Sequence, residues 1–214
     1  MKKPLSVLLI NGSPHANGCT HTALAEVAGE LHDAGIETRE LHIGSGPIYP
    51  CTACKVCLET GYCIFKNDKV NEAIDLLKEA DGVIVGSPVF YAGPNGSLCS
   101  FLDRMFFLKN LPYRFKPAAA VVSCRRGGAS ASFDRLNKYF TLSSMPLVSS
   151  QYWNAVHGMT PDEVLQDTEG LQIMRTLGRN MAWLLKCLDA TKETVPYPVL
   201  EPWAPTNFIR DLSE

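Results

Sequence analysis

Four cysteines lie within thirteen residues, in the pattern Cys51-x2-Cys54-x2-Cys57-x5-Cys63. Thiolates at such compact spacing can converge on an iron-sulfur cluster. The common ferredoxin pattern ends in a cysteine followed by proline, and Cys63 is followed by isoleucine instead. Zinc also accepts four thiolates, although this spacing is unusual for a zinc knuckle. The residues alone therefore leave three states open: ligands of a cluster, ligands of zinc, or free or oxidised thiols.

A second group of polar residues follows the apolar run Leu5–Ile10. The segment from Asn11 to Thr20 is rich in small residues, hydroxyls and amides, and an expected helix follows it. The first turn of a helix can hold a phosphate without Lys or Arg, and this segment contains neither. It matches neither the dinucleotide pattern G-x-G-x-x-G nor a Walker loop, so a mononucleotide phosphate fits better. The alternative is an ordinary turn in which Asn17 or Thr20 caps the helix. The candidate phosphate-binding residues are Ser13, Pro14, His15, Asn17, Gly18, Cys19 and Thr20.

Aromatic residues stand beside glycines and prolines in the segment 86–96. Such a loop forms a rigid, partly apolar shelf whose backbone can approach a planar ring, as an isoalloxazine requires. The alternative is that Phe90 and Tyr91 only fill the core. The candidate shelf residues are Pro88, Val89, Phe90, Tyr91, Ala92, Gly93 and Asn95.

These two loops carry a family resemblance that covers roughly residues 5–125. The run G-S-P-x-x-N-G-x-T at 12–20 resembles the phosphate loop of the NADPH-dependent FMN reductases, a group with the flavodoxin fold. The segment from Ser87 to Arg104 is similar to that family's pattern S-P-x-Y-x-G-x-x-x-G-x-x-K-x-F-x-D-R. Phe90 replaces the first ring position, Cys99 falls where lysine is frequent, and Cys19 stands where a small polar residue is commoner.

The resemblance implies bound FMN and a third loop that closes over the pyrimidine edge of the flavin. Backbone donors there would stabilise the negative charge that develops on reduction. The residues assigned to this loop are Ser123, Arg125, Gly127 and Gly128. The arginine side chains could instead contact a nicotinamide cofactor or remain solvated.

The cysteine pattern also resembles the iron-sulfur flavoproteins, FMN proteins of the same fold that carry a 4Fe-4S cluster after the second strand. That resemblance implies that the cluster ligands are Cys51, Cys54, Cys57 and Cys63. Similar cysteine-rich loops also occur in flavodoxin-fold reductases without a cluster. Asp68, further along this loop, is interpreted as a cap of the next helix.

The elements that must position these loops alternate between short apolar runs and longer helical stretches, which is typical of βαβ units. The strands are expected at Leu5–Ile10, Glu37–Ile43, Gly82–Ser87, Ala118–Ser123 and Pro146–Ser150. The helices are expected near Thr20–Ala34, Lys69–Glu79, Ser97–Leu108, Ser130–Phe140 and Leu171–Leu188. We predict an α/β, flavodoxin-like three-layer sandwich with a five-stranded parallel sheet in the order 2-1-3-4-5. In such a sheet a ligand binds beyond the carboxyl ends of the strands, where the loops beginning at Asn11, Ile43, Pro88 and Cys124 lie.

The chain of 214 residues is long enough for one core, so residues 1–193 are predicted to form one domain with a cysteine-rich insertion at 44–68. Residues 194–214 carry four prolines and are expected to form an extended arm on the body or on a neighbouring subunit. The net charge is −2 and no basic run exceeds Arg125-Arg126, which disfavours nucleic acid as a partner. Neither a signal peptide nor a membrane span is expected, and eight cysteines then indicate a reducing, cytoplasmic location. We expect a homodimer or homotetramer.

Three functions are compatible with these residues. The first is an FMN-dependent NAD(P)H oxidoreductase that reduces flavin, quinone or a related small acceptor. The second is an iron-sulfur flavoprotein that carries electrons between a ferredoxin-like partner and FMN, and the third is a non-catalytic flavin-binding module. Trp153, Asn154 and His157 could line the substrate side of the flavin, or serve as a core tryptophan, a capping asparagine and a structural histidine. No catalytic side chain is assigned, because hydride transfer to the flavin needs none if solvent reaches N5.

Overall fold

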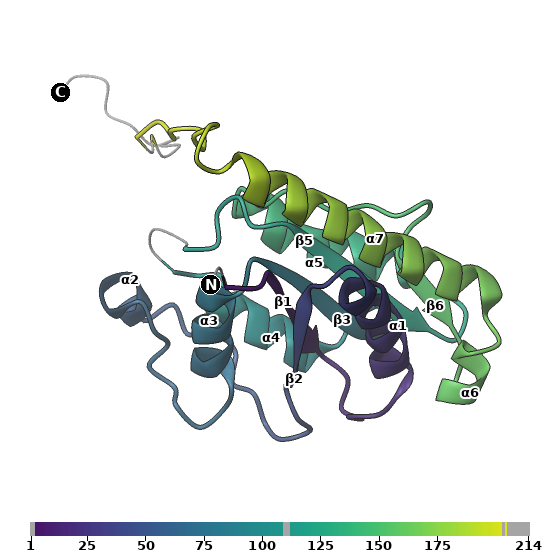
Figure 1. Ribbon diagram of the computed structural model, residues 1–214. Helices are drawn as coiled ribbons and strands as arrows, with labels where there is room; N and C mark the ends of the chain where they lie inside the picture. Colours follow the sequence, from purple (N-terminus) through teal and green to yellow (C-terminus); the bar gives the residue numbers. More distant parts are fainter. Residues whose placement is uncertain (1–2, 109–111, 203, 205–214) are drawn as a thin grey trace.

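The computed structural model describes residues 3–108, 112–202 and 204. Within them, parallel strands form one sheet in the order β2-β1-β3-β5-β6 (Figure 1). Their bounds are β1 (Ser6–Asn11), β2 (Glu37–His42), β3 (Gly82–Phe90), β5 (Ala118–Cys124) and β6 (Ala155–His157). A two-residue strand, β4 (Gly93–Pro94), pairs antiparallel with the end of β3. Apart from this small addition, the predicted strand order is confirmed.

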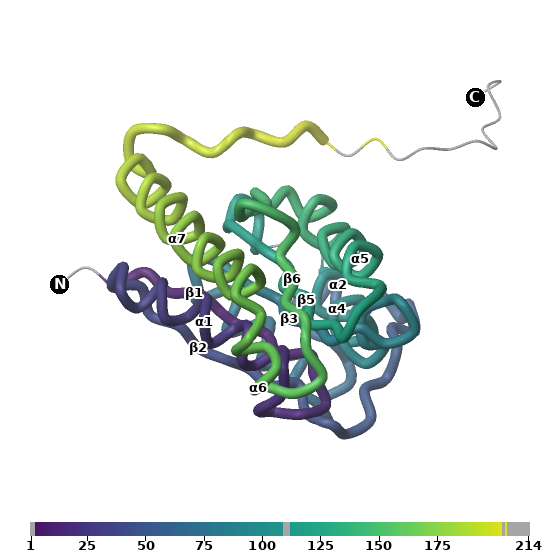
Figure 2. The backbone as a smooth tube through the Cα atoms, turned by 90° about the vertical axis from the view of Figure 1, so that its right-hand side faces the viewer, coloured from purple at the N-terminus to yellow at the C-terminus, as the bar shows by residue number. Residues whose placement is uncertain are grey.

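Helices cover both faces of the sheet, so the protein has three layers (Figures 1 and 2). One face is covered by α1 (Cys19–Asp33) and α7 (Thr168–Thr191). The other is covered by α3 (Val70–Glu79), α4 (Gly96–Met105) and α5 (Ala129–Leu142). Two short helices, α2 (Val56–Thr60) and α6 (Pro161–Val164), lie in connections and were not predicted from the sequence.

The alternation of side chains along β1 explains why both faces need a cover. Leu8 and Ile10 belong to the core under α3 and α4, whereas Val7 and Leu9 belong to the core under α1 and α7. Because successive side chains of a strand point to opposite faces, a continuous apolar run is stable only between two layers of helices. The apolar run that opens the sequence therefore becomes a central strand.

The position of the last strand differs from the prediction. The expected strand Pro146–Ser150 contributes only an isolated bridge between Leu147 and Ala118, and the regular pairing with β5 is made by β6. Between the Leu147 bridge and β6 the chain forms no regular strand. There the Asn154 side-chain amide donates to the Ala120 carbonyl at 3.0 Å, and the Ser150 hydroxyl donates to the Asn154 side-chain oxygen at 2.7 Å. Side-chain hydrogen bonds thus replace the ladder over this stretch, which the apolar pattern of the sequence did not indicate.

The segment after α7 leaves the body of the domain. Residues 192–202 contain no helix or strand in the described part of the arm, and Tyr197 stacks on Phe115 with ring centroids 5.0 Å apart. Of the arm predicted at 194–214, residues 203 and 205–214 lie outside the described residues. Within the residues that the structure describes, no helix combines the length and hydrophobicity needed to cross a membrane.

Candidate functional site

An open pocket of about 520 Å³ lies beyond the carboxyl ends of β1, β3 and β5, and we call it the main pocket. That volume lies within the range of about 300–1,000 Å³ typical of small-molecule sites. The pocket brings together candidates from three loops that are far apart in the sequence. They are Ser13, Pro14, His15, Asn17, Gly18, Cys19, Thr20, Pro88, Val89, Phe90, Ser123 and Arg125.

The first loop of the main pocket is held in shape by its own polar groups. Asn11 is fully buried, and its side chain accepts from the Ser13 N–H at 3.1 Å and donates to the Ala16 carbonyl at 3.1 Å. The Ser13 hydroxyl accepts from the His15 N–H at 3.1 Å. Behind the loop, His42 Nε2 lies 2.7 Å from the Ser13 carbonyl. A loop fixed in this way needs little reordering when a ligand arrives.

The amino terminus of α1 faces this loop and keeps its donors free. Gly18 is the residue before the helix, so it offers no capping side chain. Among the described residues, no acceptor is bonded to the N–H groups of Cys19 and Thr20. The sequence alternative, a turn in which Asn17 or Thr20 caps the helix, therefore does not describe this end. Free first-turn N–H groups and the helix dipole are what an anion requires.

The Thr20 side chain connects two walls of the main pocket. Its hydroxyl lies 2.8 Å from that of Ser123, and both groups are buried. This hydrogen bond joins the first turn of α1 to the end of β5. Two candidates that are 103 residues apart in the sequence thus fix two walls of the main pocket relative to each other.

The expected ring shelf is a hairpin made by β3 and β4, with its turn at Tyr91 and Ala92. Both turn residues have positive φ, +49° and +61°, and the Tyr91 side chain is fully exposed and does not line the main pocket. Ala92, Gly93 and Asn95 also lie outside the lining. Val89 and Phe90 supply the apolar surface that faces the pocket. The sequence analysis assigned the whole loop to one binding surface, whereas Tyr91 and Ala92 are exposed at the turn of the hairpin.

Asn95 acts on the backbone of the neighbouring loops. Its side-chain N–H donates to the Gly12 carbonyl at 2.6 Å, and its oxygen accepts from the Ser97 N–H at 3.0 Å, which caps α4. Its own N–H donates to the Ser87 hydroxyl at 3.0 Å. Asn95 is buried and joins the first loop, the hairpin and α4.

The loop after β5 separates the main pocket from a second hollow. Gly128 has φ +93° and lies so close to the hairpin that a Cβ there would be 2.6 Å from the Ala92 Cα atom. Gly127 and Gly128 line the second hollow, together with Arg126, Tyr152, Trp153 and His157. Trp153 is 54% exposed, so it is not a core tryptophan. Asn154 is buried against β5, and the His157 ring is exposed, with Nδ1 3.5 Å from Asp167.

Sequence reasoning missed one wall of the main pocket, the segment from Gly158 to Pro161. Cys19 Sγ lies 3.8 Å from the Gly158 carbonyl, which closes the pocket against this wall. The Thr160 hydroxyl accepts from the Glu163 N–H at 3.2 Å and the Glu163 carboxylate accepts from the Met159 N–H at 2.7 Å. The pattern Thr-Pro-x-Glu is a helix-start signal that could have located α6, although not its place beside the first loop.

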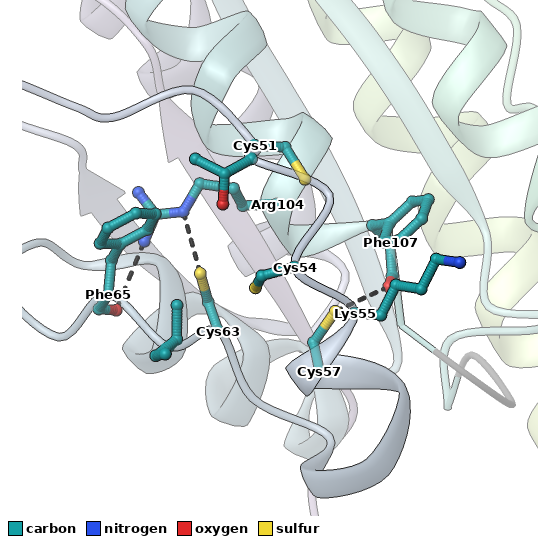
Figure 3. A pocket seen from close by; sticks show the side chains of 10 residues that line it. Cys51, Cys54, Lys55, Cys57, Cys63, Phe65, Arg104 and Phe107 are labelled. Atoms are coloured by element: carbon teal, nitrogen blue, oxygen red, sulfur yellow. Dashed lines mark hydrogen bonds between the residues drawn. The ribbon is translucent and has the colours of Figure 1, made fainter.

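The four clustered cysteines line a single hollow, which we call the cysteine hollow (Figure 3). Cys51 and Cys54 are exposed, Cys57 is buried and Cys63 is half-buried. Ala53 and Lys55 have positive φ, +53° and +63°, so the chain turns sharply on each side of Cys54. The pKa of Cys57 is raised by burial and then by the three neighbouring cysteines, which reflects how closely the four groups face one another.

A buried arginine completes the cysteine hollow. Arg104, in the last turn of α4, donates from Nε to the Cys63 sulfur at 3.1 Å (Figure 3). Its guanidinium also pairs with both oxygens of Asp68. Asp68 does accept from the Val70 N–H at 3.1 Å, but its interpretation as only a helix cap was incomplete, because its main partner is Arg104.

The donor set of the cysteine hollow has the chemistry of a cluster site and of a zinc site, because both accept four thiolates. Zinc requires four sulfurs at about 2.3 Å from one point. A cluster of four irons takes one thiolate on each iron, so its ligands need to surround a hollow and not to meet at a point. Four thiols around one hollow satisfy that condition.

Helix α4 links the two sites. Asn95 precedes its first turn and contacts the loop after β1, and Arg104 lies in its last turn at the cysteine hollow. Over nine residues the helix rises about 14 Å. One short helix therefore connects the loops beside the main pocket to the thiols.

Comparison with known proteins places this chain among characterised groups. The family model for NADPH-dependent FMN reductase matches residues 5–160. An iron-sulfur flavoprotein of Methanocaldococcus jannaschii is 31% identical over 192 residues, which cover 86% of this chain and 99% of that protein. An iron-sulfur flavoprotein of Methanosarcina thermophila is 24% identical over 188 residues, which cover 86% of this chain and 97% of that protein.

Solved structures share the fold at low sequence identity. RosB, determined with the bound intermediate 8-demethyl-8-formylriboflavin-5′-phosphate, is 14% identical with a TM-score of 0.70, over 97% of this chain and 94% of that one. The WrbA-like flavodoxin of Agrobacterium tumefaciens is 14% identical with a TM-score of 0.61, over 86% of this chain and 99% of that one. The predicted flavodoxin-like fold is confirmed.

Proposed function

Because this chain belongs to the NADPH-dependent FMN reductase family, with an iron-sulfur flavoprotein among its full-length relatives, we propose that it binds FMN in the main pocket and a 4Fe-4S cluster at Cys51, Cys54, Cys57 and Cys63. The family and these relatives make it a flavin-dependent oxidoreductase. The proposed activity is electron transfer between the two groups and an external donor or acceptor. The main observation behind this proposal is that four thiols from one loop line one hollow. The last turn of α4, the helix that follows the β3–β4 hairpin, lies at the same hollow.

The FMN phosphate would lie at the amino terminus of α1. The free N–H groups of the first turn and the fixed loop from Ser13 to Gly18 supply donors and partial positive charge, so no lysine or arginine is needed from the loop. The Thr20–Ser123 hydrogen bond holds this donor group against the end of β5. These contacts orient the ligand without changing its chemistry.

The ring would lie on the apolar surface of Val89 and Phe90, with the β5–α5 loop at its polar edge. Donors from the backbone around Arg125, Gly127 and Gly128 would favour the more negative, reduced state of the ring. Gly127 and Gly128 line the second hollow, so this assignment requires the ring edge to reach the boundary between the two hollows. FMN would supply the redox chemistry, and the residues here would bind and orient it.

The cysteines bring a second redox group that a simple reductase does not need. Figure 3 shows all four side chains around the same hollow, with Arg104 beside Cys63. Two relatives whose names include iron and sulfur match this chain over 99% and 97% of their own length. Of the functions considered from the sequence, these observations favour the iron-sulfur flavoprotein. In this proposal a ferredoxin-like protein is the electron partner.

Direct reduction by NADH or NADPH is the second candidate. The family description favours it, and the second hollow, lined by Arg126, Tyr152 and Trp153 beside the main pocket, offers an aromatic and cationic surface for a nicotinamide nucleotide. Rapid bleaching of the FMN band by either nucleotide would support this route. Bleaching only by a reduced ferredoxin would assign the electron source to a protein partner.

Cysteine variants purified without oxygen test the two sites separately. Wild-type protein should contain one FMN with iron and sulfide at about four per chain. Cys63→Ser should lose iron and sulfide and keep FMN. Cys99→Ser is the matched control, because Cys99 is half-buried in α4 and lies outside the cysteine hollow. Equal iron in the wild type and Cys63→Ser would contradict the ligand assignment, and a colourless wild type would contradict FMN binding.

A further inference from the structure

Arg104 uses every hydrogen-bond donor of its guanidinium inside the protein. Its side chain is 1% exposed. Nε donates to Cys63 Sγ at 3.1 Å, Nη1 donates to the Tyr49 carbonyl at 3.3 Å and to Asp68, and Nη2 donates to the Phe65 carbonyl at 3.4 Å and to Asp68 Oδ1 at 3.1 Å. A guanidinium has five N–H donors, so none is left over.

The ion pair alone does not account for this arrangement. A buried charge needs an opposite charge, and Asp68, whose side chain is 6% exposed, meets that need through the two Nη atoms. The Nε–H points elsewhere, to one sulfur of the cysteine hollow (Figure 3). The contact between the Nε–H and the Cys63 sulfur is therefore additional to the ion pair, which does not require it.

Cys57, the buried thiol of the hollow, makes the opposite kind of hydrogen bond. Cys57 Sγ donates to the Phe107 carbonyl at 3.1 Å, a hydrogen bond that needs the proton of the thiol. Cys63 accepts, so its contact with Arg104 persists and strengthens when the sulfur carries negative charge. The Arg104 contact therefore suits a Cys63 sulfur that carries negative charge, as a cluster ligand does.

The same arginine fixes the loop that carries the ligands. It bonds to carbonyls at Tyr49 and Phe65, on the two sides of the four cysteines, and its charge lies over the Phe65 ring, 5.1 Å from the centroid. The Tyr49 and Phe65 rings stack at 5.3 Å. Both ends of the cysteine loop are thereby tied to the last turn of α4.

We infer that Arg104 is a positioning residue that sets the reduction potential of the cluster through its N–H bond to the Cys63 sulfur. This inference rests on the proposed function. Hydrogen bonds to ligand sulfurs and nearby positive charge stabilise the more negative, reduced cluster and raise its potential. Asp68 opposes that field, so the pair Arg104–Asp68 sets the potential by balance.

Two substitutions separate tuning from simple structural support. Arg104→Gln removes the charge and the Nε donor, so the reduced-to-oxidised ratio at a fixed potential should fall about tenfold, which is about 59 mV for a one-electron couple. Asp68→Asn leaves the guanidinium without its counter-charge, so the potential should rise. A role limited to folding predicts no such opposite pair of shifts.

The experiment is an anaerobic redox titration of purified holoprotein with dithionite as the electron donor, followed by electron paramagnetic resonance, with iron and sulfide assayed on each sample. Arg135→Gln is the matched control. Arg135 is exposed and pairs at 3.4 Å with Asp103, the residue that precedes Arg104 in the chain. Its potential should equal that of the wild type.

If Arg104→Gln loses its iron, Arg104→Lys and Asp68→Asn decide the question. The lysine keeps a charge but one ammonium cannot serve both Asp68 and Cys63 in the same geometry. A raised potential in Asp68→Asn with a lowered one in Arg104→Lys supports the inference. Loaded variants that keep the wild-type potential, or that shift it in one direction, overturn the inference and leave the cluster assignment intact. A wild type without iron and sulfide overturns the proposed function itself.

Discussion

The side-chain amide of Asn95 donates a hydrogen bond of 2.6 Å to the carbonyl of Gly12, 83 residues earlier in the chain. The same side chain caps α4 through the Ser97 N–H. Asn95 therefore determines how the hairpin after β3 lies against the loop after β1. If FMN binds between these loops, its affinity depends on a residue that does not line the main pocket.

Asn95→Asp tests this dependence, because aspartate keeps the helix cap and replaces the donor facing Gly12 by an acceptor. We expect a free energy of unfolding lower by about 1–3 kcal/mol and weaker FMN binding. Asn95→Ala should lose the cap as well, at a further cost of about 1 kcal/mol. Urea unfolding of the apoprotein and FMN fluorescence titration measure both effects. Wild-type FMN affinity in both variants would show that the two loops bind the ligand independently.

Gly12 is predicted to tolerate no side chain. A Cβ there would lie 2.5 Å from Leu98 Cδ2 and 2.8 Å from the Gly86 carbonyl, so Gly12→Ala should destabilise the fold by about 1–3 kcal/mol. Gly29→Ala is the matched control, because its Cβ meets no described atom within 4 Å and it lies on the exposed face of α1. That change should stabilise by up to about 1 kcal/mol. Thermal or urea unfolding of the pair compares them, and equal stabilities would refute the packing argument.

The phosphate is predicted to be held by backbone N–H groups and not by a cationic side chain. Riboflavin, which lacks the phosphate, should therefore bind at least about tenfold more weakly than FMN, since each charge-assisted hydrogen bond contributes about 1.5–3 kcal/mol. Arg125 lines the main pocket, so Arg125→Gln is the informative variant and Arg126→Gln its control. Isothermal titration should give similar FMN affinities for both variants. A selective loss of FMN binding, but not of riboflavin binding, in Arg125→Gln would assign the phosphate to that side chain.

Two buried tyrosines predict a loss of stability in alkali. Burial raises the pKa of Tyr113, and burial followed by the hydrogen bond to Asp103 raises the pKa of Tyr139. A folded-state pKa above the unfolded value of about 10 means that unfolding releases protons above that pH. The stabilisation from each protonated tyrosine is therefore fully present below about pH 10. Above that pH, the free energy of unfolding falls by about 1.4 kcal/mol per pH unit for each tyrosine.

The variant that checks this pH dependence is Tyr113→Phe. Within the described residues the Tyr113 hydroxyl has no hydrogen-bond partner, so its removal should cost little at pH 8. Urea unfolding at pH 8 and at pH 10.5–11 should show a smaller alkaline loss in Tyr113→Phe than in the wild type. The same loss of stability in alkali in both proteins would show that Tyr113 does not cause it.

Much of the fold could be predicted because local pattern and tertiary environment agree. The apolar run ending at Ile10 becomes β1, and the strand order follows from alternating strands and helices. The last strand was misplaced because Ser150 and Asn154 replace the ladder by side-chain hydrogen bonds. Such a detour leaves no periodicity to detect.

The candidate site was predictable where it lies on one loop and not where it depends on distant segments. Ser13 to Thr20 and the cysteine pattern are contiguous, and each gathers in one place. The wall from Gly158 to Pro161 reaches the first loop only through the fold, and Arg104 meets Asp68 across 36 residues. A buried ion pair has no local pattern, so Asp68 was interpreted only as a helix cap.

The most direct test of the two-cofactor account is the absorbance spectrum of wild-type protein purified without oxygen, with FMN, iron and acid-labile sulfide measured on the same sample. The account predicts flavin bands together with a broad shoulder near about 400 nm, one FMN, and about four irons and four sulfides per chain. Flavin bands without iron or sulfide would contradict it, leaving an FMN reductase whose four cysteines are free or oxidised thiols.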